Sequence, residues 1–104
     1  RITAVGDRVF AAEFSTELTD GRLDHAVTYR PHALPDSVLR LLLTLLERLS
    51  LPFAAIDMRI DDRGEYWFLE LNPAGVFLGV ETRTGLPIAS AMADLLLATA
   101  AGRR

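Results

Sequence analysis

The stretch from Phe53 to Leu71 constrains the fold most, because two runs of β-forming residues flank a short polar turn. The turn contains Asp61-Asp62-Arg63-Gly64, which is typical of a β-hairpin. If the loop holds residues 62–65, Ile60 faces Trp67, and one face carries only apolar side chains: Ile56, Met58, Ile60, Trp67, Leu69 and Leu71. A shift of one residue would turn this whole face toward water. The pattern therefore predicts a well-defined hairpin with Trp67 in the core.

The opposite face of this hairpin brings two carboxylates together. In the same register Asp57 lies opposite Glu70, and Asn72 points the same way from two residues further along. Opposed side chains have Cβ atoms about 4.5–5.5 Å apart, and like charges there destabilise a sheet. Either one carboxyl is protonated, or an arginine such as Arg59 lies between them, or a cation bridges them. Two carboxylates and an amide oxygen suit Mg²⁺ or Mn²⁺, and the alternative is an ordinary solvated sheet face.

The N-terminal part of the chain predicts a second antiparallel hairpin. β-forming runs at Ile2–Val5 and Val9–Phe14 flank the short loop Gly6-Asp7-Arg8. Ala26–Tyr29 predicts a further short strand that ends before a proline. These strands add to the later hairpin to give one antiparallel sheet.

Two helices are expected to pack on this sheet. Between Pro35 and Pro52 the polar residues form only a narrow stripe at helical spacing, which predicts a nearly buried helix. A Gly-rich loop at 73–79 then leads to a second helix, which begins after Pro87 and continues to about Ala98. The order of elements predicts an α+β fold: an antiparallel β-sheet with two packed helices.

The composition excludes several classes of function. The 104 residues carry a net charge of −3, which gives no electrostatic reason to bind nucleic acid or an anionic membrane. The chain has no cysteine, so disulfides and thiolate metal sites are excluded. No apolar run is long enough to span a bilayer, and no secretory signal precedes the first strand. We expect a single cytoplasmic domain over residues 1–104.

Several motifs, in order, resemble the ATP-grasp ligases. Asp57 on one strand and Glu70-x-Asn72 at the end of the next match the signature of that superfamily. The opening R-I-T-A-V-G-D-R-V-F-A-A-E-F and the continuation N-P-A-G-V-F-L-G-V-E-T-R-T-G-L-P-I-A resemble its RimK-like branch. D-G-R at residues 20–22 and P-H-A-L-P at 31–35 look most like the maturases of graspetides, which are microviridin-type ribosomal peptides. Those enzymes more often carry D-W-R where this chain has D-G-R.

The resemblance implies a role for each matching residue. Asp57, Glu70 and Asn72 would hold Mg²⁺ ions that bridge the phosphates of ATP, with Asn72 also counted among the nucleotide-binding residues. Arg1 and Arg22 would contact phosphates or an acyl-phosphate intermediate, as catalytic and nucleotide-binding residues. A hydroxyl or amine would then attack the acyl phosphate. The implied product is an ester or amide cross-link in a ribosomal precursor peptide.

The resemblance also implies that this chain is the C-terminal portion of a longer ATP-grasp domain. The lysines and lid that clasp ATP in that superfamily lie upstream, and the 11 basic residues here are all arginines. We expect this piece alone to be inactive. Apolar surface that upstream subdomains cover would be bare in it, which favours homo-oligomers.

Alternatives remain at the level of sequence. The chain could be a non-catalytic module that binds a peptide or partner at its sheet edge, or a ligase that acts on a protein tail or a small amino acid. Arg1 and Arg22 could be plain terminal and loop charges. Glu81 is expected on a solvated loop, His32 in a structural or peptide-facing position, and Phe68 in the wall of the site.

Overall fold

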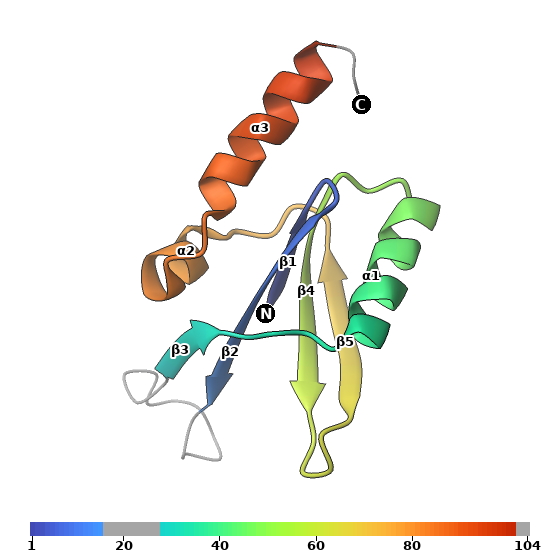
Figure 1. Ribbon diagram of the computed structural model, residues 1–104, viewed down its shortest axis with the longest axis vertical. Helices are drawn as coiled ribbons and strands as arrows, with labels where there is room; N and C mark the ends of the chain where they lie inside the picture. The colour runs from blue at the N-terminus through green and yellow to red at the C-terminus, as the bar shows by residue number, and fades with distance from the viewer. Residues whose placement is uncertain (16–27, 102–104) are drawn as a thin grey trace.

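The computed structural model describes residues 1–15 and 28–101 of the chain. The elements, in chain order, are β1 (Ile2–Val5), β2 (Arg8–Ser15), β3 (Thr28–Pro31), α1 (Asp36–Arg48), β4 (Phe53–Ile60), β5 (Tyr66–Asn72), α2 (Leu78–Thr84) and α3 (Ile88–Ala100). The strands form one five-stranded sheet in the order β3-β2-β1-β4-β5, and every neighbouring pair is antiparallel (Figure 1). The predicted α+β fold with an antiparallel sheet is confirmed.

The structure has three helices where two were predicted, because α2 begins in the last two residues of the expected Gly-rich loop and continues to Thr84. This helix has seven residues and ends at Gly85, whose φ of 75° is in the left-handed region that glycine favours. A helix this short is marginal in isolation. It forms here because Phe77, Val80 and Leu86 pack against the buried cluster that contains Ile88. A local pattern in the sequence does not reveal such packing.

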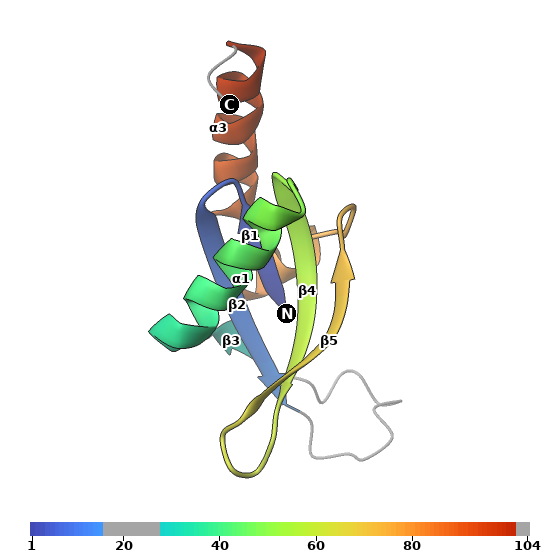
Figure 2. The same cartoon turned by 90° about the vertical axis from the view of Figure 1, so that its right-hand side faces the viewer.

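The helices cover the two faces of the sheet separately. The face under α1 is a cluster of buried apolar residues from β1, β2, β4 and the helix: Ile2, Ala4, Ala11, Leu42, Leu46, Ala54 and Ile56. On the other face, Val5 packs with Ile88 and Ala91 of α3. Figure 2 shows α1 on one side of the strands, whereas α3 extends beyond the end of the sheet opposite the β4–β5 turn. Among the described residues, no helix has the length and hydropathy needed to cross a bilayer.

The β4–β5 hairpin has the predicted register only in its inner half, which is the part between the bulge and the end of β5 at Asn72. Asp57 pairs with Glu70 and Ile56 with Leu71, as predicted. A bulge follows, so that Ile60 faces Tyr66 instead of Trp67. The turn therefore spans the five residues 61–65 and is closed by hydrogen bonds between Asp61 and its neighbours across the turn.

The bulge and the limited reach of α1 leave Trp67 on the surface. Its side chain is 52% exposed, so the prediction that it lies in the core is wrong. Its indole Nε1 donates a hydrogen bond of 2.9 Å to Oδ2 of Asp61 at the turn. Leu69 is also exposed, while Ile56 is fully buried under α1. Beyond the bulge the predicted apolar face is not formed, because Trp67 pairs with Arg59 and Phe68 pairs with Met58.

Candidate functional site

Asp57 and Glu70 meet on the face of the sheet that is turned away from α1. Their neighbour Ile56 packs under α1, and alternate residues of a strand point to opposite faces. Asp57 is the register partner of Glu70, and Ala55 is the partner of Asn72. The three residues predicted to bind metal therefore occupy adjacent positions at one end of the β4–β5 ladder.

Arg1 lies against Asp57. Its Nε donates to Oδ1 of Asp57 over 2.6 Å, and its Nη1 donates to the carbonyl oxygen of Val76 over 3.3 Å. The backbone of Arg1 pairs with Ala12 in both directions, at 3.0 and 2.9 Å, so the residue extends the β1–β2 ladder. The guanidinium lies beside Asp57, which reduces the repulsion that two opposed carboxylates would otherwise feel.

The chain that leaves β5 folds back over the site. Oδ1 of Asn72 accepts a hydrogen bond of 2.9 Å from the backbone nitrogen of Ala74, which fixes the turn. Gly75 then passes so close to the sheet that a Cβ there would overlap with the Cβ of Ala55. The absence of a side chain at Gly75 brings the carbonyl of Val76 within reach of Arg1.

These elements enclose a groove of about 450 Å³ that crosses the sheet. Its floor receives side chains from all five strands or their ends, and α2 with the preceding loop forms one wall. The lining residues are Arg1, Phe14, Tyr29, Asp57, Met58, Leu69, Val76, Gly79, Val80 and Arg83. Leu69 lines the groove and Phe68 does not, so the prediction of Phe68 as a wall of the site is wrong, because the bulge changes which residue of β5 faces it.

The oxygen donors beside the groove, of which only Asp57 lines it, fit a hard divalent cation. Asp57 and Glu70 supply carboxylates in register, and Asn72 supplies an amide oxygen next to them. Within residues 1–15 and 28–101, no three His, Cys, Asp or Glu side chains are grouped as a complete metal cage. A cation held by two carboxylates would complete its shell with other oxygens, such as phosphate and water, which is the usual coordination of Mg²⁺.

The structure tests the prediction for Glu81 but not the one for Arg22. Arg22, with the D-G-R motif around it, lies outside the described residues. Glu81 belongs to α2 and accepts a hydrogen bond from the backbone nitrogen of Ala89, so it binds the first turn of α3. The expectation that Glu81 lies on a solvated loop is therefore wrong, and its role is to join two helices.

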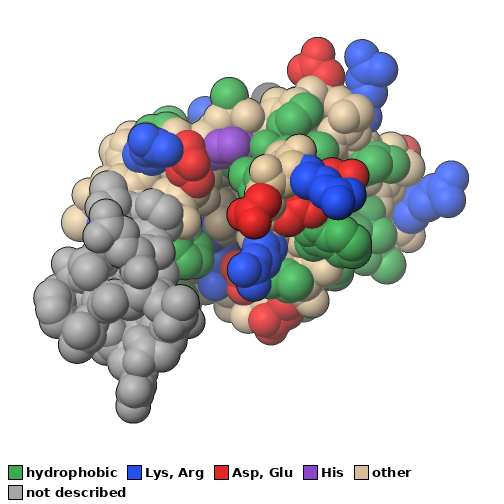
Figure 3. All heavy atoms as spheres, turned by 90° about the horizontal axis from the view of Figure 1, so that it is seen from below, with side chains coloured by type: hydrophobic (Ala, Val, Ile, Leu, Met, Phe, Trp, Pro, Cys, Tyr) green, Lys and Arg blue, Asp and Glu red, His purple; other side chains and the backbone are tan. Residues whose placement is uncertain are grey.

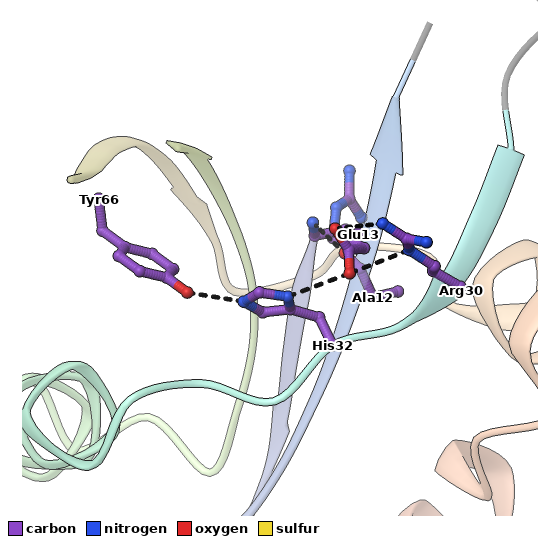
Figure 4. Close-up of polar contacts among 6 residues, drawn as sticks. Ala12, Glu13, Arg30, His32 and Tyr66 are labelled. Carbon is purple, nitrogen blue, oxygen red and sulfur yellow. Dashed lines mark hydrogen bonds and ion pairs between the residues drawn. The ribbon is translucent and has the colours of Figure 1, made fainter. Parts of the chain in front are cut away.

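His32 lies on the other face of the sheet, in a polar network that ties three strands together (Figure 4). Its Nε2 is 2.7 Å from the hydroxyl of Tyr66, and its Nδ1 is 3.4 Å from Oε1 of Glu13. Arg30 Nε lies 3.1 Å from the same Glu13 oxygen. Hydrogen bonds from Arg30 and then from His32 lower the pKa of Glu13. This arrangement agrees with the structural alternative for His32.

Charge on the surface is mixed in the view from below. Figure 3 shows acidic and basic side chains beside one another among hydrophobic ones. Such a face has no single sign of charge to attract a polyanion. It agrees with the small net charge of the sequence, −3.

Four residues that line the groove could not be recognised from the sequence: Phe14, Tyr29, Val76 and Arg83. Phe14 and Tyr29 lie opposite each other on β2 and β3, and no local pattern in the sequence predicts this pairing. Arg83 stands inside the T-R-T-G stretch, which carries the family resemblance without indicating a role for the arginine.

Comparison with known proteins gives matches among solved structures. No protein-family description and no curated protein matches the chain. The macrocyclase MdnC from Microcystis aeruginosa MRC, solved with the precursor peptide MdnA, has a TM-score of 0.81 and 35% identity over 92% of this chain and 31% of MdnC. An RiPP-associated ATP-grasp ligase from Chryseobacterium gregarium, solved with ADP and a leader and core peptide, has a TM-score of 0.81 and 31% identity over 94% of this chain and 32% of the ligase.

A third match is in fold alone. The ATP-grasp ligase PsnB, solved with a phosphomimetic variant of its minimal precursor, Mg and ADP, has a TM-score of 0.78 and 21% identity over 93% of this chain and 30% of PsnB. The chain thus spans about a third of the length of each protein it matches. These matches confirm the resemblance that the motifs indicate: in sequence and in fold, the chain is similar to the C-terminal part of RiPP-associated ATP-grasp ligases.

Proposed function

We propose that this chain supplies the metal- and phosphate-binding half of an ATP- and Mg²⁺-dependent ligase that modifies a ribosomal precursor peptide. The observation that carries the proposal is the register of Asp57 opposite Glu70, with Arg1 bound to Asp57 at the floor of a groove. The peptides and ADP in the structures of MdnC and the Chryseobacterium ligase support the class of substrate.

The reaction has two steps. The terminal phosphoryl group of ATP is transferred to a carboxylate oxygen of the peptide, which forms an acyl phosphate and releases ADP. A hydroxyl or amine of the peptide then attacks the acyl carbon, forms an ester or amide bond, and expels phosphate as the nucleophile loses its proton. Both steps move negative charge between oxygens, so cationic groups in fixed positions would lower the barrier.

Residues of this chain would perform separate parts of this chemistry. Asp57, Glu70 and Asn72 would hold Mg²⁺, which supplies charge neutralisation for the phosphates when bound. Nε of Arg1 binds Asp57 and Nη1 donates to Val76, so Nη2 and the second hydrogen of Nη1 would contact a phosphate or the acyl phosphate. Arg22 is proposed for the same task from the resemblance. Leu69 offers an apolar surface beside the carboxylates, suited to the nucleotide base.

The test uses the complete enzyme, ATP, Mg²⁺ and the precursor peptide. Asp57→Asn and Glu70→Gln are expected to lower ligation by at least about a hundred-fold, which is in the range reported for loss of an electrostatic catalytic group. Mass spectrometry would follow the loss of one water per bond formed, and ADP release would be followed in parallel. Arg48→Gln, on the solvent side of α1, is the matched control and should keep full activity.

Direct metal binding separates the ligase from a non-catalytic module. Mn²⁺ binding, followed by electron paramagnetic resonance, should depend on both Asp57 and Glu70. If Mn²⁺ binds equally to the wild type and to both variants, or if Asp57→Asn leaves ligation near the wild-type rate, the assignment of the site is wrong.

A further inference from the structure

Arg83 lies at the end of the groove that is furthest from the carboxylates. The groove extends from Leu69 on β5 to Tyr29 on β3, and these strands form the two edges of the sheet. Arg83 reaches the β3 end from the last turn of α2. From β4 to β3 there are three strand spacings of about 4.8 Å, so this end lies roughly 14 Å from Asp57.

The guanidinium of Arg83 is held in place by stacking. Its central carbon lies 4.9 Å from the centroid of the Tyr29 ring. Tyr29 is itself stacked on Phe14, with ring centroids 5.3 Å apart and planes inclined by 29°. Stacking on an aromatic face orients a guanidinium while its edge stays available for hydrogen bonds. Phe14 is 52% exposed, so the platform is open to the groove.

Gly79 makes room for this placement. A Cβ at Gly79 would lie 3.0 Å from Nη1 of Arg83, closer than ordinary contact. Instead, Nη1 donates a long hydrogen bond of 3.4 Å to the carbonyl oxygen of Gly79, one turn back in α2. The side chain is thus folded back along its own helix toward Tyr29.

Arg83 has no carboxylate partner among residues 1–15 and 28–101. The ion pairs that arginines form in that part of the chain join Arg1 to Asp57, Arg8 to Asp94 and Arg30 to Glu13. A guanidinium that is stacked, oriented and left with free donors at the end of a groove is suited to bind a planar anion of the substrate. A carboxylate binds the two parallel N–H groups of a guanidinium through two hydrogen bonds.

We propose that Arg83, Tyr29 and Phe14 form a subsite for an acidic side chain of the peptide, distinct from the carboxylate that is activated. This inference rests on the proposed function, because it takes the activation site to be at Asp57 and Glu70. An extended peptide covers about 3.3–3.6 Å per residue. The separation of roughly 14 Å therefore places the bound acid about four residues from the activated one.

The experiment compares two labelled synthetic peptides on the complete enzyme with Mg²⁺ and ADP. Both carry one glutamate for activation, and the position four residues away is glutamate in one peptide and glutamine in the other. Fluorescence anisotropy should show the wild-type enzyme binding the first peptide about ten-fold more tightly, which corresponds to one charge-assisted hydrogen-bonded contact. Arg83→Gln should bring this ratio close to one.

A second variant and a control sharpen the test. Gly79→Ala should reduce the same ratio, because the added methyl displaces the guanidinium from its position. Arg48→Gln on α1 should leave the ratio unchanged. The subsite is wrong if Arg83→Gln keeps the preference for the acid. It is equally wrong if that variant loses affinity for ADP, since Arg83 would then be a phosphate contact.

Failure of the subsite can be told apart from failure of the proposed function. Asp57→Asn should abolish ligation and still prefer the acidic peptide. Arg83→Gln should raise the KM for the acidic peptide about ten-fold and leave kcat within about two-fold, because the contact is made equally in the bound substrate and the transition state. A preference for the acid that depends on Arg83, in an enzyme that forms no bond, would support the subsite and refute the ligase.

Discussion

Gly75 and Ala55 are in closer contact than any side chain at position 75 would allow. A Cβ built on Gly75 overlaps with the Cβ of Ala55, which is itself buried in the sheet. Ala55 pairs with Asn72, so the close approach occurs directly beside the candidate metal ligands. The position of the loop over the site therefore depends on two small residues.

Replacement of Gly75 by alanine tests this contact. Gly75→Ala should lower the free energy of unfolding by about 1–3 kcal/mol, because the new methyl overpacks a site bounded by backbone. In an Ala55→Gly background the same change should cost much less, since the opposing methyl is gone. Urea denaturation of the four proteins of this cycle gives the coupling energy. Equal costs in both backgrounds would show that the loop moves away freely.

The carboxylate pair should matter little for stability. Asp57 and Arg1 are partly exposed, at 37% and 29%, so the loss of this ion pair in Asp57→Asn should cost at most about 1 kcal/mol. Glu70→Gln should leave stability unchanged or raise it by a few tenths of a kcal/mol, because it removes a like charge across the strand pair. Thermal melts of the two variants check this, and unfolding of either at room temperature would contradict it.

Trp67 and Ile56 should respond very differently to truncation. Trp67→Ala removes a half-exposed ring and one hydrogen bond to Asp61, and it should cost on the order of 1 kcal/mol. Ile56→Ala empties a fully buried site under α1 and should cost about 2–5 kcal/mol. Chemical denaturation of both variants gives the comparison. Similar costs for the two would place Trp67 in the core after all.

The turn of the β4–β5 hairpin should depend on acid pH. The hydrogen bond from Trp67 and those from backbone nitrogens lower the pKa of Asp61. Because the folded pKa is below the unfolded value, near 4, the ionised carboxylate stabilises the turn above that value. This stabilisation is lost as the pH falls through the folded pKa.

Trp67 is the single tryptophan of the chain, so its fluorescence reports the titration. The signal should stay constant down to about pH 4, the ordinary aspartate pKa, and change below it. Asp61→Asn should remove the transition, while Asp62→Asn should retain it. A midpoint above the ordinary aspartate pKa would contradict the assigned hydrogen bonds.

Thr3 is a buried hydroxyl in the centre of the sheet. It is fully buried, and its Oγ1 has no hydrogen-bond partner in the described part of the chain. Burial of an unpaired polar group costs about 1–3 kcal/mol. Thr3→Val should therefore raise the free energy of unfolding by about 1 kcal/mol, measured by urea denaturation. Thr3→Ser, which keeps the hydroxyl and loses a methyl, is the control and should be destabilising.

The sequence predicted the parts of the fold that one face of a strand or helix determines. The register of Asp57 opposite Glu70 was correct because Ile56 and Leu71 must both face the core beneath α1. The bulge was not predictable from the same rule. Beyond the reach of α1 the residues are exposed, so burial no longer distinguishes one register from the next.

Only the part of the groove beside Asp57 could be predicted from the sequence. Asp57, Glu70 and Asn72 lie on one hairpin, where local spacing determines their neighbours. The stack of Arg83 on Tyr29 joins segments more than fifty residues apart and depends on the packing of α2, a helix too short for its own pattern to reveal. The contact between Arg1 and Asp57 is likewise a product of the tertiary fold.

The bulge next to Asp57 separates the turn from the paired carboxylates. Because it takes up one residue on β5, the pairs beyond it are offset by one residue from the pairs that contain Asp57 and Glu70. An insertion or deletion at residues 61–65 could then be absorbed in the outer half of the hairpin, with the alignment of Asp57 and Glu70 preserved. The outer half of the hairpin is therefore the place where we expect insertions, labels and substitutions to leave the site at Asp57 and Glu70 unchanged.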